Sequence, residues 1–196
     1  MKEIEVRELF KTSKEKTPDK LTEIGKKVSE GLKLEEGTPA NYFQERFQIS
    51  GIIADTIYET TQCLGIEVPN VGLLYGWNDN KGRINYTAVS AATEKGVIKF
   101  SPEFLKVVAM GFSRNGISAK PQIRSLVNTT AHEVYHAYQM ERFPKASGKD
   151  IRKDVKNYNL AIRFDLKIEK MPHSRSERGA LIFGRLVEKI KSKKLK

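Results

Sequence analysis

The chain has 196 residues, of which 39% are hydrophobic, and it carries a formal net charge of +11 at pH 7. This length and apolar content suffice for one domain with a buried core, and no segment approaches the roughly 20 apolar residues of a membrane-spanning helix. A single cysteine, Cys63, excludes a framework of intrachain disulfides, and a charged N-terminus without an apolar stretch argues against a signal peptide, so we expect a cytoplasmic protein.

The first 37 residues are highly charged, with nine basic and nine acidic side chains. Apolar residues recur there at helical spacing: Leu21, Ile24, Val28 and Leu32. We interpret residues 1–37 as a charged helical N-terminal appendage that serves as a docked helix, a partner-binding arm or a removable leader. Residues 38–196 then form the main domain.

An α+β fold is predicted for this main domain. A long helix begins at Thr38-Pro39, which suits an N-cap followed by proline, and runs to about Leu64. Three runs typical of strands follow, and a turn over 78–82 joins the first two. These runs are 70–77, 83–90 and 96–100. We therefore expect a small antiparallel or mixed three-stranded sheet that is backed by the long helix.

Helices are predicted to dominate the rest of the chain. Ser101-Pro102 begins a short helix, and 111–120 contains two glycines and no clear period, which indicates a loop. A helix over 121–140 comes next, and Asp150 can cap a further helix that runs to about Lys170.

The helix over 121–140 contains the sequence His132-Glu133-Val-Tyr-His136, the H-E-x-x-H pattern of zinc peptidases. Residues four apart on a helix lie on the same face, so both histidines can direct a ring nitrogen at one metal ion. Glu133 projects about 100° round the helix from His132, where it can take a proton from a metal-bound water. The sequence thus predicts a zinc site with Glu133 as its general base.

The residues around this motif carry no charge, although charged residues make up 30% of the chain. They are Thr129, Thr130, Ala131, Val134, Tyr135, Ala137 and Tyr138. A helix segment without charges is usually buried, so the two histidines belong to the interior or to the wall of a cleft. The alternative to a metal site is a hydrogen-bonded histidine pair in the core.

A catalytic zinc normally has a third protein ligand, for which Glu177 is the best candidate. It lies in the first turn of a helix announced by Pro172 and Ser174. In the competing interpretation, Ser174-x-x-Glu177 is a capping box, in which Glu177 bonds to the backbone amide of Ser174. His173 has the wrong spacing for a metzincin, and it stays a weaker candidate together with Asp165 and Glu169.

The two motifs together resemble those of gluzincin zinc metallopeptidases. The H-E-V-Y-H sequence is followed some forty residues later by a helix with E-x-x-A, namely Glu177 and Ala180. Within that group the chain is most similar to minimal gluzincins and to the peptidases that cleave phage-type repressors, and the resemblance covers roughly 68–190. It implies a zincin-like fold, zinc on His132, His136 and Glu177, and Glu133 as general base and acid.

The resemblance also implies a peptide or protein substrate that pairs in extended form with an edge strand of the sheet. We take Gly96–Phe100 as the candidate for this strand, with an ordinary core strand as the alternative. Many gluzincins use a further histidine or tyrosine to stabilise the oxyanion, and no suitable histidine is left here. The remaining candidates for this role are Tyr135, Tyr138, Tyr158, Arg175 and Arg178.

Positive charge is concentrated in the last quarter of the chain. Residues 145–196 carry sixteen basic and six acidic side chains, which is ten of the eleven surplus charges. The densest run, 189–196, is either a solvated helix end or an electrostatic handle for nucleic acid or an acidic substrate. The alternative to a zinc metalloendopeptidase is a catalytically silent zincin-like module that binds zinc and that can associate with nucleic acid through this basic region.

Overall fold

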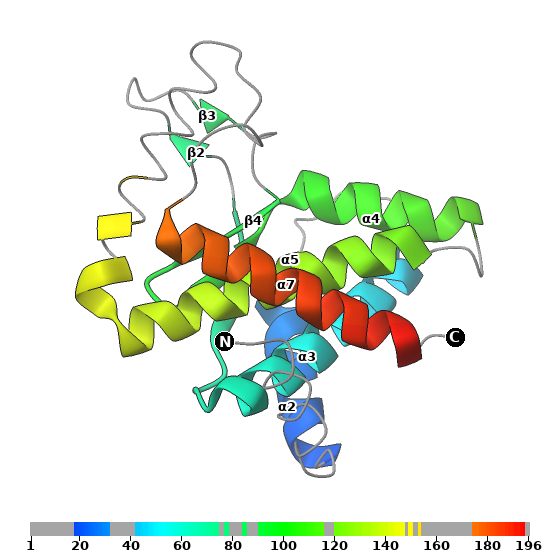
Figure 1. Ribbon diagram of the computed structural model, residues 1–196. Coiled ribbons are helices and arrows are strands. Elements are labelled where there is room, and N and C mark those ends of the chain that lie inside the picture. Colours follow the sequence, from blue (N-terminus) through cyan, green and yellow to red (C-terminus); the bar gives the residue numbers. More distant parts are fainter. Residues whose placement is uncertain are drawn as a thin grey trace.

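The computed structural model of the protein is an α+β structure that is mostly helical and contains a small three-stranded mixed sheet (Figure 1). It describes residues 18–31, 42–74, 77–78, 84–85, 90–115, 120–147, 149–150, 153 and 174–194. The α+β class predicted from the sequence is confirmed.

The described helices are α2 (Pro18–Gly31), α3 (Tyr42–Leu64), α4 (Pro102–Asn115), α5 (Lys120–Arg142) and α7 (Arg175–Lys194). The start predicted for α4 is confirmed, because the Ser101 hydroxyl accepts a hydrogen bond from the Phe104 amide at 3.2 Å. This helix continues to Asn115, so the loop predicted from residue 111 begins too early. Residues 116–119, and most of the helix predicted between 150 and 170, lie outside the described residues.

The three-stranded sheet has the order β1-β5-β4. Strand β1 (Asn70–Leu73) pairs in parallel with β5 (Val97–Phe100), and β5 pairs in antiparallel with β4 (Ala91–Glu94). Lys95 and Gly96 join β4 to β5, and both have positive φ angles, 49° and 77°. Two such residues form the tight turn that matches the twist of a hairpin, and glycine takes this conformation without strain.

The mixed sheet is confirmed, but one of its members differs from the prediction. The expected strand over 83–90 is represented by β3 (Ile84–Asn85), which pairs with β2 (Trp77–Asn78) in a separate two-stranded sheet, as the predicted hairpin requires. Its place in the three-stranded sheet is taken by β4, which the alternation of polar and apolar residues did not reveal. The prediction of an edge strand over 96–100 is wrong, because β5 is the central strand, and the alternative of an ordinary core strand is confirmed.

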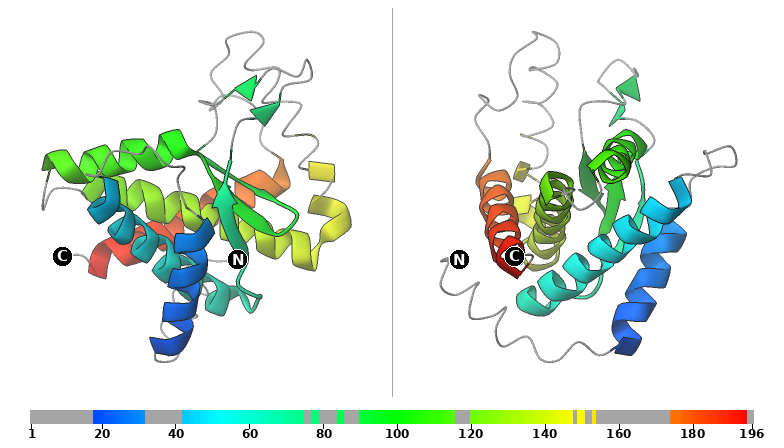
Figure 2. Two further views of the ribbon diagram at one scale, coloured as in Figure 1. Left: turned by 180° about the vertical axis from the view of Figure 1, so that it is seen from behind. Right: turned by 90° about the vertical axis from the view of Figure 1, so that its right-hand side faces the viewer.

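Helix α5 lies between the sheet and α7 and is buried along much of its length. The right-hand view of Figure 2 shows α7 beside α5 on one side of the molecule, with α3 and α2 on the other. The closest helical neighbours of the sheet are α5 and α2, whereas α3 packs against α2, α4 and α5. Helix α3 therefore supports the sheet largely through these neighbours, rather than by the direct backing that we expected.

The hydrophobic core joins α2, α3, the sheet, α4, α5 and α7 in one cluster. Ile24 and Val28 of α2 are buried in it, so this part of the N-terminal segment is a docked helix. Cys63 is also buried, and desolvation raises the pKa of its thiol to about 11, which makes it an inert apolar side chain as predicted. Among the described helices, none is long and apolar enough to cross a membrane.

Candidate metal centre

Helix α5 presents His132 and His136 on one face, one turn apart. Residues on its opposite sides, including Leu126, Val134 and Ala137, are buried in the core, so the helix is held along its length. Pro121 in the first turn and Pro144 just beyond the last turn suit the two ends of the helix. Both imidazoles are nearly buried, with 14% and 13% of the side-chain surface exposed.

Helix α7 brings Glu177 to these histidines from 41 residues further along the chain. The Ser174 hydroxyl accepts a hydrogen bond from the Glu177 amide at 3.0 Å, which confirms the N-cap predicted for Ser174. The carboxylate of Glu177 points to the histidines, where its Oε2 lies 3.0 Å from Nε2 of His136. The cap therefore holds the first turn of α7 in place, and the side chain of Glu177 reaches α5.

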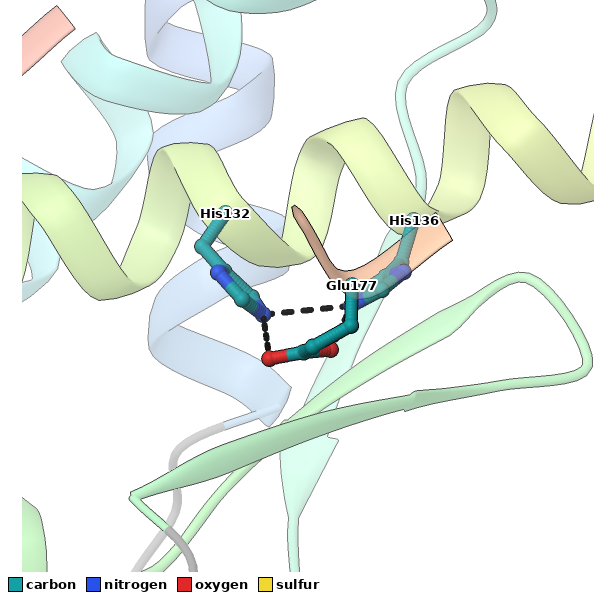
Figure 3. Close-up of side chains that lie close together, drawn as sticks. All are labelled: His132, His136 and Glu177. Carbon is teal, nitrogen blue, oxygen red and sulfur yellow. Dashed lines mark hydrogen bonds and ion pairs between the residues drawn. The ribbon is translucent and has the colours of Figure 1, made fainter. Parts of the chain in front are cut away.

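Three potential ligand atoms converge between α5 and α7 (Figure 3). The Nε2 atoms of His132 and His136 are 3.1 Å apart, and Oε1 of Glu177 lies 3.5 Å from Nε2 of His132. The ligand atoms of all three residues lie within 4.8 Å of one another, so the cluster can hold a metal ion. The structure thus brings together the three residues that the sequence predicted as metal ligands.

A hydrogen-bond network behind His136 determines which of its ring nitrogens carries the proton. The side-chain amide of Gln139 donates to the main-chain oxygen of Ser176 at 3.0 Å, so its Oε1 must face the other way. This Oε1 lies 3.0 Å from Nδ1 of His136 and also accepts a bond from the Ser176 hydroxyl at 2.6 Å. Since Oε1 can only accept, Nδ1 of His136 carries a hydrogen, and Nε2 of the neutral ring is free to bind a cation.

The same network continues to Asp150, whose Oδ2 accepts a hydrogen bond from the Ser176 amide at 3.0 Å. Ser176 is therefore held at its amide, its hydroxyl and its carbonyl, and it precedes Glu177 directly. Neither Gln139 nor Ser176 was predicted from the sequence. The signal that points to them is their position, since Gln139 lies three residues after His136 on the same helix face.

The electrostatics of the three ligands require a positive charge among them. Burial opposes protonation of His136, but its hydrogen bond to Glu177 and the nearby charges of Glu133 and Glu177 outweigh this and raise its pKa above 6.5. Burial acts to raise the pKa of Glu177, yet hydrogen bonds to His132 and His136 bring that pKa far below its usual range. Lone pairs that meet at about 3 Å repel one another, so a proton or a metal ion has to lie between them.

Glu133 is 5% exposed and lies against the edge strand β4. The hydroxyl of Thr93 on β4 is 2.8 Å from Oε2 of Glu133 and 2.9 Å from the main-chain oxygen of the same residue. Oε1 of Glu133 lies 3.9 Å from Nε2 of His132, so the carboxylate flanks the three ligands. Thr93 is a further site residue that no sequence pattern indicated, because it lies on the strand that was not predicted.

Gly184 allows α7 to approach α5 closely at the level of the histidines. A Cβ atom at this position would lie 2.7 Å from Oδ1 and 2.8 Å from the main-chain oxygen of Asn128, and 3.3 Å from Cβ of His132. Any larger residue would therefore push the two helices apart. Asn128 itself donates a hydrogen bond from Nδ2 to Oε2 of Glu188, which links the helices further along.

Other residues predicted for the site have different surroundings. Tyr135 stacks on Phe183 of α7 with a ring-centroid distance of 5.0 Å, and Tyr138 packs against Tyr135 and Phe143. These contacts give both tyrosines a packing role, and burial raises the pKa of the Tyr135 hydroxyl. Arg175 and Arg178 are exposed on α7. The remaining candidates, Tyr158, Asp165, Glu169 and His173, lie outside the described residues.

Comparison with known proteins adds no further identification. The chain matches no family model, no curated protein and no solved structure. The geometry of the site is therefore the basis for assigning a function.

Proposed function

We propose that the chain is a zinc-dependent metalloendopeptidase of the gluzincin type with a zincin-like domain. The observation that carries this proposal is the convergence of His132, His136 and Glu177 beside the buried carboxylate of Glu133. Two imidazoles and one carboxylate are the protein ligand set of a catalytic zinc site, which keeps a further position open for water or substrate. A purely structural zinc site would have four protein ligands.

The spacing of the three ligands supports zinc as the metal. A tetrahedral zinc ion with bonds of about 2.0–2.2 Å separates its ligand atoms by about 3.3–3.6 Å. The Nε2 atoms of His132 and His136 are 3.1 Å apart, and Glu177 brings Oε2 to 3.0 Å from His136 and Oε1 to 3.5 Å from His132. With one ligand atom per residue the three atoms lie within 4.8 Å of one another, so a shift of the Glu177 carboxylate would accompany binding.

When bound, zinc supplies a Lewis acid that activates water and polarises a carbonyl group. The protein residues hold and move the protons. Glu133 takes a proton from the attacking water and delivers it to the leaving amine, which requires its carboxylate to alternate between ionised and protonated forms. Gln139 holds the proton on Nδ1 of His136, so that Nε2 faces the metal position.

Strand β4 is the best candidate for aligning a peptide substrate. It is one of the two outer strands of the described three-stranded sheet, and Thr93 connects it directly to Glu133. An extended peptide that pairs with the side of β4 away from β5 would run past Glu133 and the three ligands. This assignment replaces the one made from the sequence, where the edge strand was expected at 96–100.

Two measurements test the proposal. Metal analysis of the purified protein should find about one zinc per wild-type chain and clearly less in Glu177→Ala, because two imidazoles alone bind zinc weakly. The zinc-loaded protein should then cleave members of a peptide library derived from a whole proteome. Mass spectrometry identifies the products, and because the library samples many sequences at once, the substrate need not be chosen beforehand.

The matched control is Glu133→Gln, which keeps the size of the side chain and the three ligands. It should retain zinc and lose cleavage, because the amide cannot take up the proton. Cleavage products from Glu133→Gln at the wild-type level would remove Glu133 from the mechanism. One zinc per chain without any cleavage would instead identify a catalytically silent zinc-binding module, and the absence of zinc would exclude both functions.

A further inference from the structure

The outer side of α7 carries a row of exposed side chains, and all but one of them are cations. Among the described side chains of this helix, the exposed ones are Arg175, Arg178, Ile182, Arg185 and Lys189, and we call them the basic face. At 100° per residue these five positions fall within about 80° of the helix circumference, and they extend over about 21 Å. Figure 1 shows α7 as the outer helix in front of α5.

The charges of α7 are divided between its two sides. Its acidic residues turn inward, Glu177 to the histidines and Glu188 to Asn128. Lys191 also turns inward, where its Nζ lies 2.7 Å from Oδ2 of Asp55 and 2.8 Å from Oε2 of Glu59. Lys191 therefore links α7 to α3. The basic face has no exposed acidic residue beside it among the described side chains of α7.

This arrangement does not serve the stability of α7. Arg175 and Arg178 lie in the first turn, where the positive end of the helix dipole disfavours cations. The exposed charges of α2 are of both signs, for example the pair Lys27–Glu23 at 3.2 Å. The basic face thus has the charge pattern of a surface that meets an anion.

The composition of the basic face indicates which anion. Three of its four cations are arginines, although lysines outnumber arginines in the chain. Arginine binds carboxylates in pairs of parallel hydrogen bonds and is enriched at protein interfaces. Ile182 is 57% exposed in the middle of the row, and the face contains no aromatic residue on which a base could stack. A partner that covers Ile182 has to supply an apolar side chain between its acidic groups.

We propose that the basic face binds an acidic protein segment that carries an apolar residue between its carboxylates. The binding does not depend on the proposed peptidase function. The two are adjacent, however, because Arg175 and Arg178 flank the metal ligand Glu177 in the first turn of α7. In a peptidase, such a surface would hold an acidic part of the substrate, or of a protein that delivers it, next to the site of cleavage.

The test is binding of a fluorescent peptide of alternating glutamates and aspartates with a central leucine, measured by anisotropy at several salt concentrations. Arg178→Glu/Arg185→Glu should weaken binding about tenfold or more and reduce its salt dependence, because two charges of the face are reversed. Ile182→Ser should weaken binding of the leucine peptide, and it should leave a peptide with serine in place of leucine unaffected.

The matched control is Lys20→Glu/Lys106→Glu, which changes the net charge equally at two exposed lysines of α2 and α4. It should bind the leucine peptide within about twofold of wild type. An equal loss in this control would show attraction by the overall charge and overturn the proposal. The proposal would also be overturned if the protein bound a DNA duplex more tightly than the peptide, provided that Arg178→Glu/Arg185→Glu abolished DNA binding and Ile182→Ser did not change it. Nucleic acid would then be the partner. Circular dichroism and zinc content verify that each variant is folded.

Discussion

Gln139 contacts both halves of the candidate metal centre. Its side chain accepts a hydrogen bond from His136 on α5, and it bonds both the hydroxyl and the carbonyl of Ser176 on α7. One amide group therefore sets the proton position of one ligand and the place of the residue before another ligand. Such residues behind the ligands commonly change metal affinity by about 10–100-fold, although they never contact the metal.

We predict that Gln139→Leu lowers zinc affinity about 10–100-fold, because Nδ1 of His136 loses its acceptor and Ser176 loses two partners. Competition with a fluorescent zinc chelator measures this affinity. Gln62→Leu is a matched control, since Gln62 is exposed on α3 and lies on a different helix from the ligands. Unchanged affinity in Gln139→Leu would contradict the role that we assign to the network.

Thr93 has a corresponding role for Glu133. Its hydroxyl can donate to Oε2 of the ionised carboxylate and can accept from the protonated one, so it can hold the side chain in both forms. We predict that Thr93→Val, which keeps the shape of the side chain, lowers kcat about tenfold or more and leaves zinc content and KM nearly unchanged. Thr93→Ser should restore most of the activity. The prediction fails if valine and serine variants have the same kcat, or if Thr93→Val changes only KM.

At the scale of elements, the contact between α5 and α7 forms the candidate metal centre, because each helix carries part of it. Gly184 sets the distance between them, and Lys191 holds the far end of α7 against α3. The hairpin of β4 and β5 completes the arrangement by bringing Thr93 to Glu133. The site therefore depends on three packing contacts between elements that are distant in the sequence.

We predict that Gly184→Ala separates α7 from α5, because the new Cβ would meet the main-chain oxygen of Asn128, which cannot move away cheaply. Overpacking of this kind costs about 1–3 kcal/mol of unfolding free energy. Zinc affinity should fall as well, since Glu177 moves with α7. Denaturant unfolding and zinc titration measure the two effects.

Gly51→Ala is the matched control for this substitution. Gly51 also lies inside a helix, but a Cβ atom there would have nothing within 4 Å. Alanine at such a position should leave stability unchanged or raise it by about 0.5–1 kcal/mol. If Gly184→Ala behaves like Gly51→Ala, the close contact between α5 and α7 is not needed for the site.

At the scale of the whole molecule, metal binding would be coupled to folding, because the three candidate ligands come together only in the folded chain. Without metal, the raised pKa of His136 stabilises the fold at low pH, and this contribution is lost as pH rises above 6.5 and through the raised pKa. The lowered pKa of Glu177 stabilises the fold above about pH 4.5, and this contribution is lost as pH falls towards its lowered pKa. Both contributions are therefore present together between about pH 4.5 and 6.5.

We predict opposite pH trends with and without metal. With a chelator, Tm should fall as pH rises above about 6.5 and through the raised pKa of His136, because this side chain loses its proton. Zinc competes with that proton, so the stabilisation by zinc should grow over the same range. At a free zinc concentration of about 100 Kd it amounts to about 2.7 kcal/mol, or about 5–10 °C in Tm for a chain of this size. Scanning calorimetry measures Tm with zinc and with chelator at each pH. A difference between these two Tm values that does not change with pH would contradict the assigned ligands.

The sequence by itself located the two helices of the candidate site and the candidate ligands that each one carries. Spacing along a single helix placed His132 and His136 on one face, and the N-cap at Ser174 located the first turn that contains Glu177. These inferences succeeded because helical geometry is local and repeats about every 3.6 residues. The zincin-like fold and the peptidase activity remain proposals.

Only the tertiary structure decided the sheet order, the edge strand and the residues that support the ligands. Strand β5 is central because β1 joins it in parallel from a distant part of the chain, and no local pattern encodes this pairing. Thr93 meets Glu133 across 40 residues, and Gln139 meets Ser176 across 37. Such contacts depend on how whole elements pack against one another, and packing is a property of the folded chain rather than of any segment of its sequence.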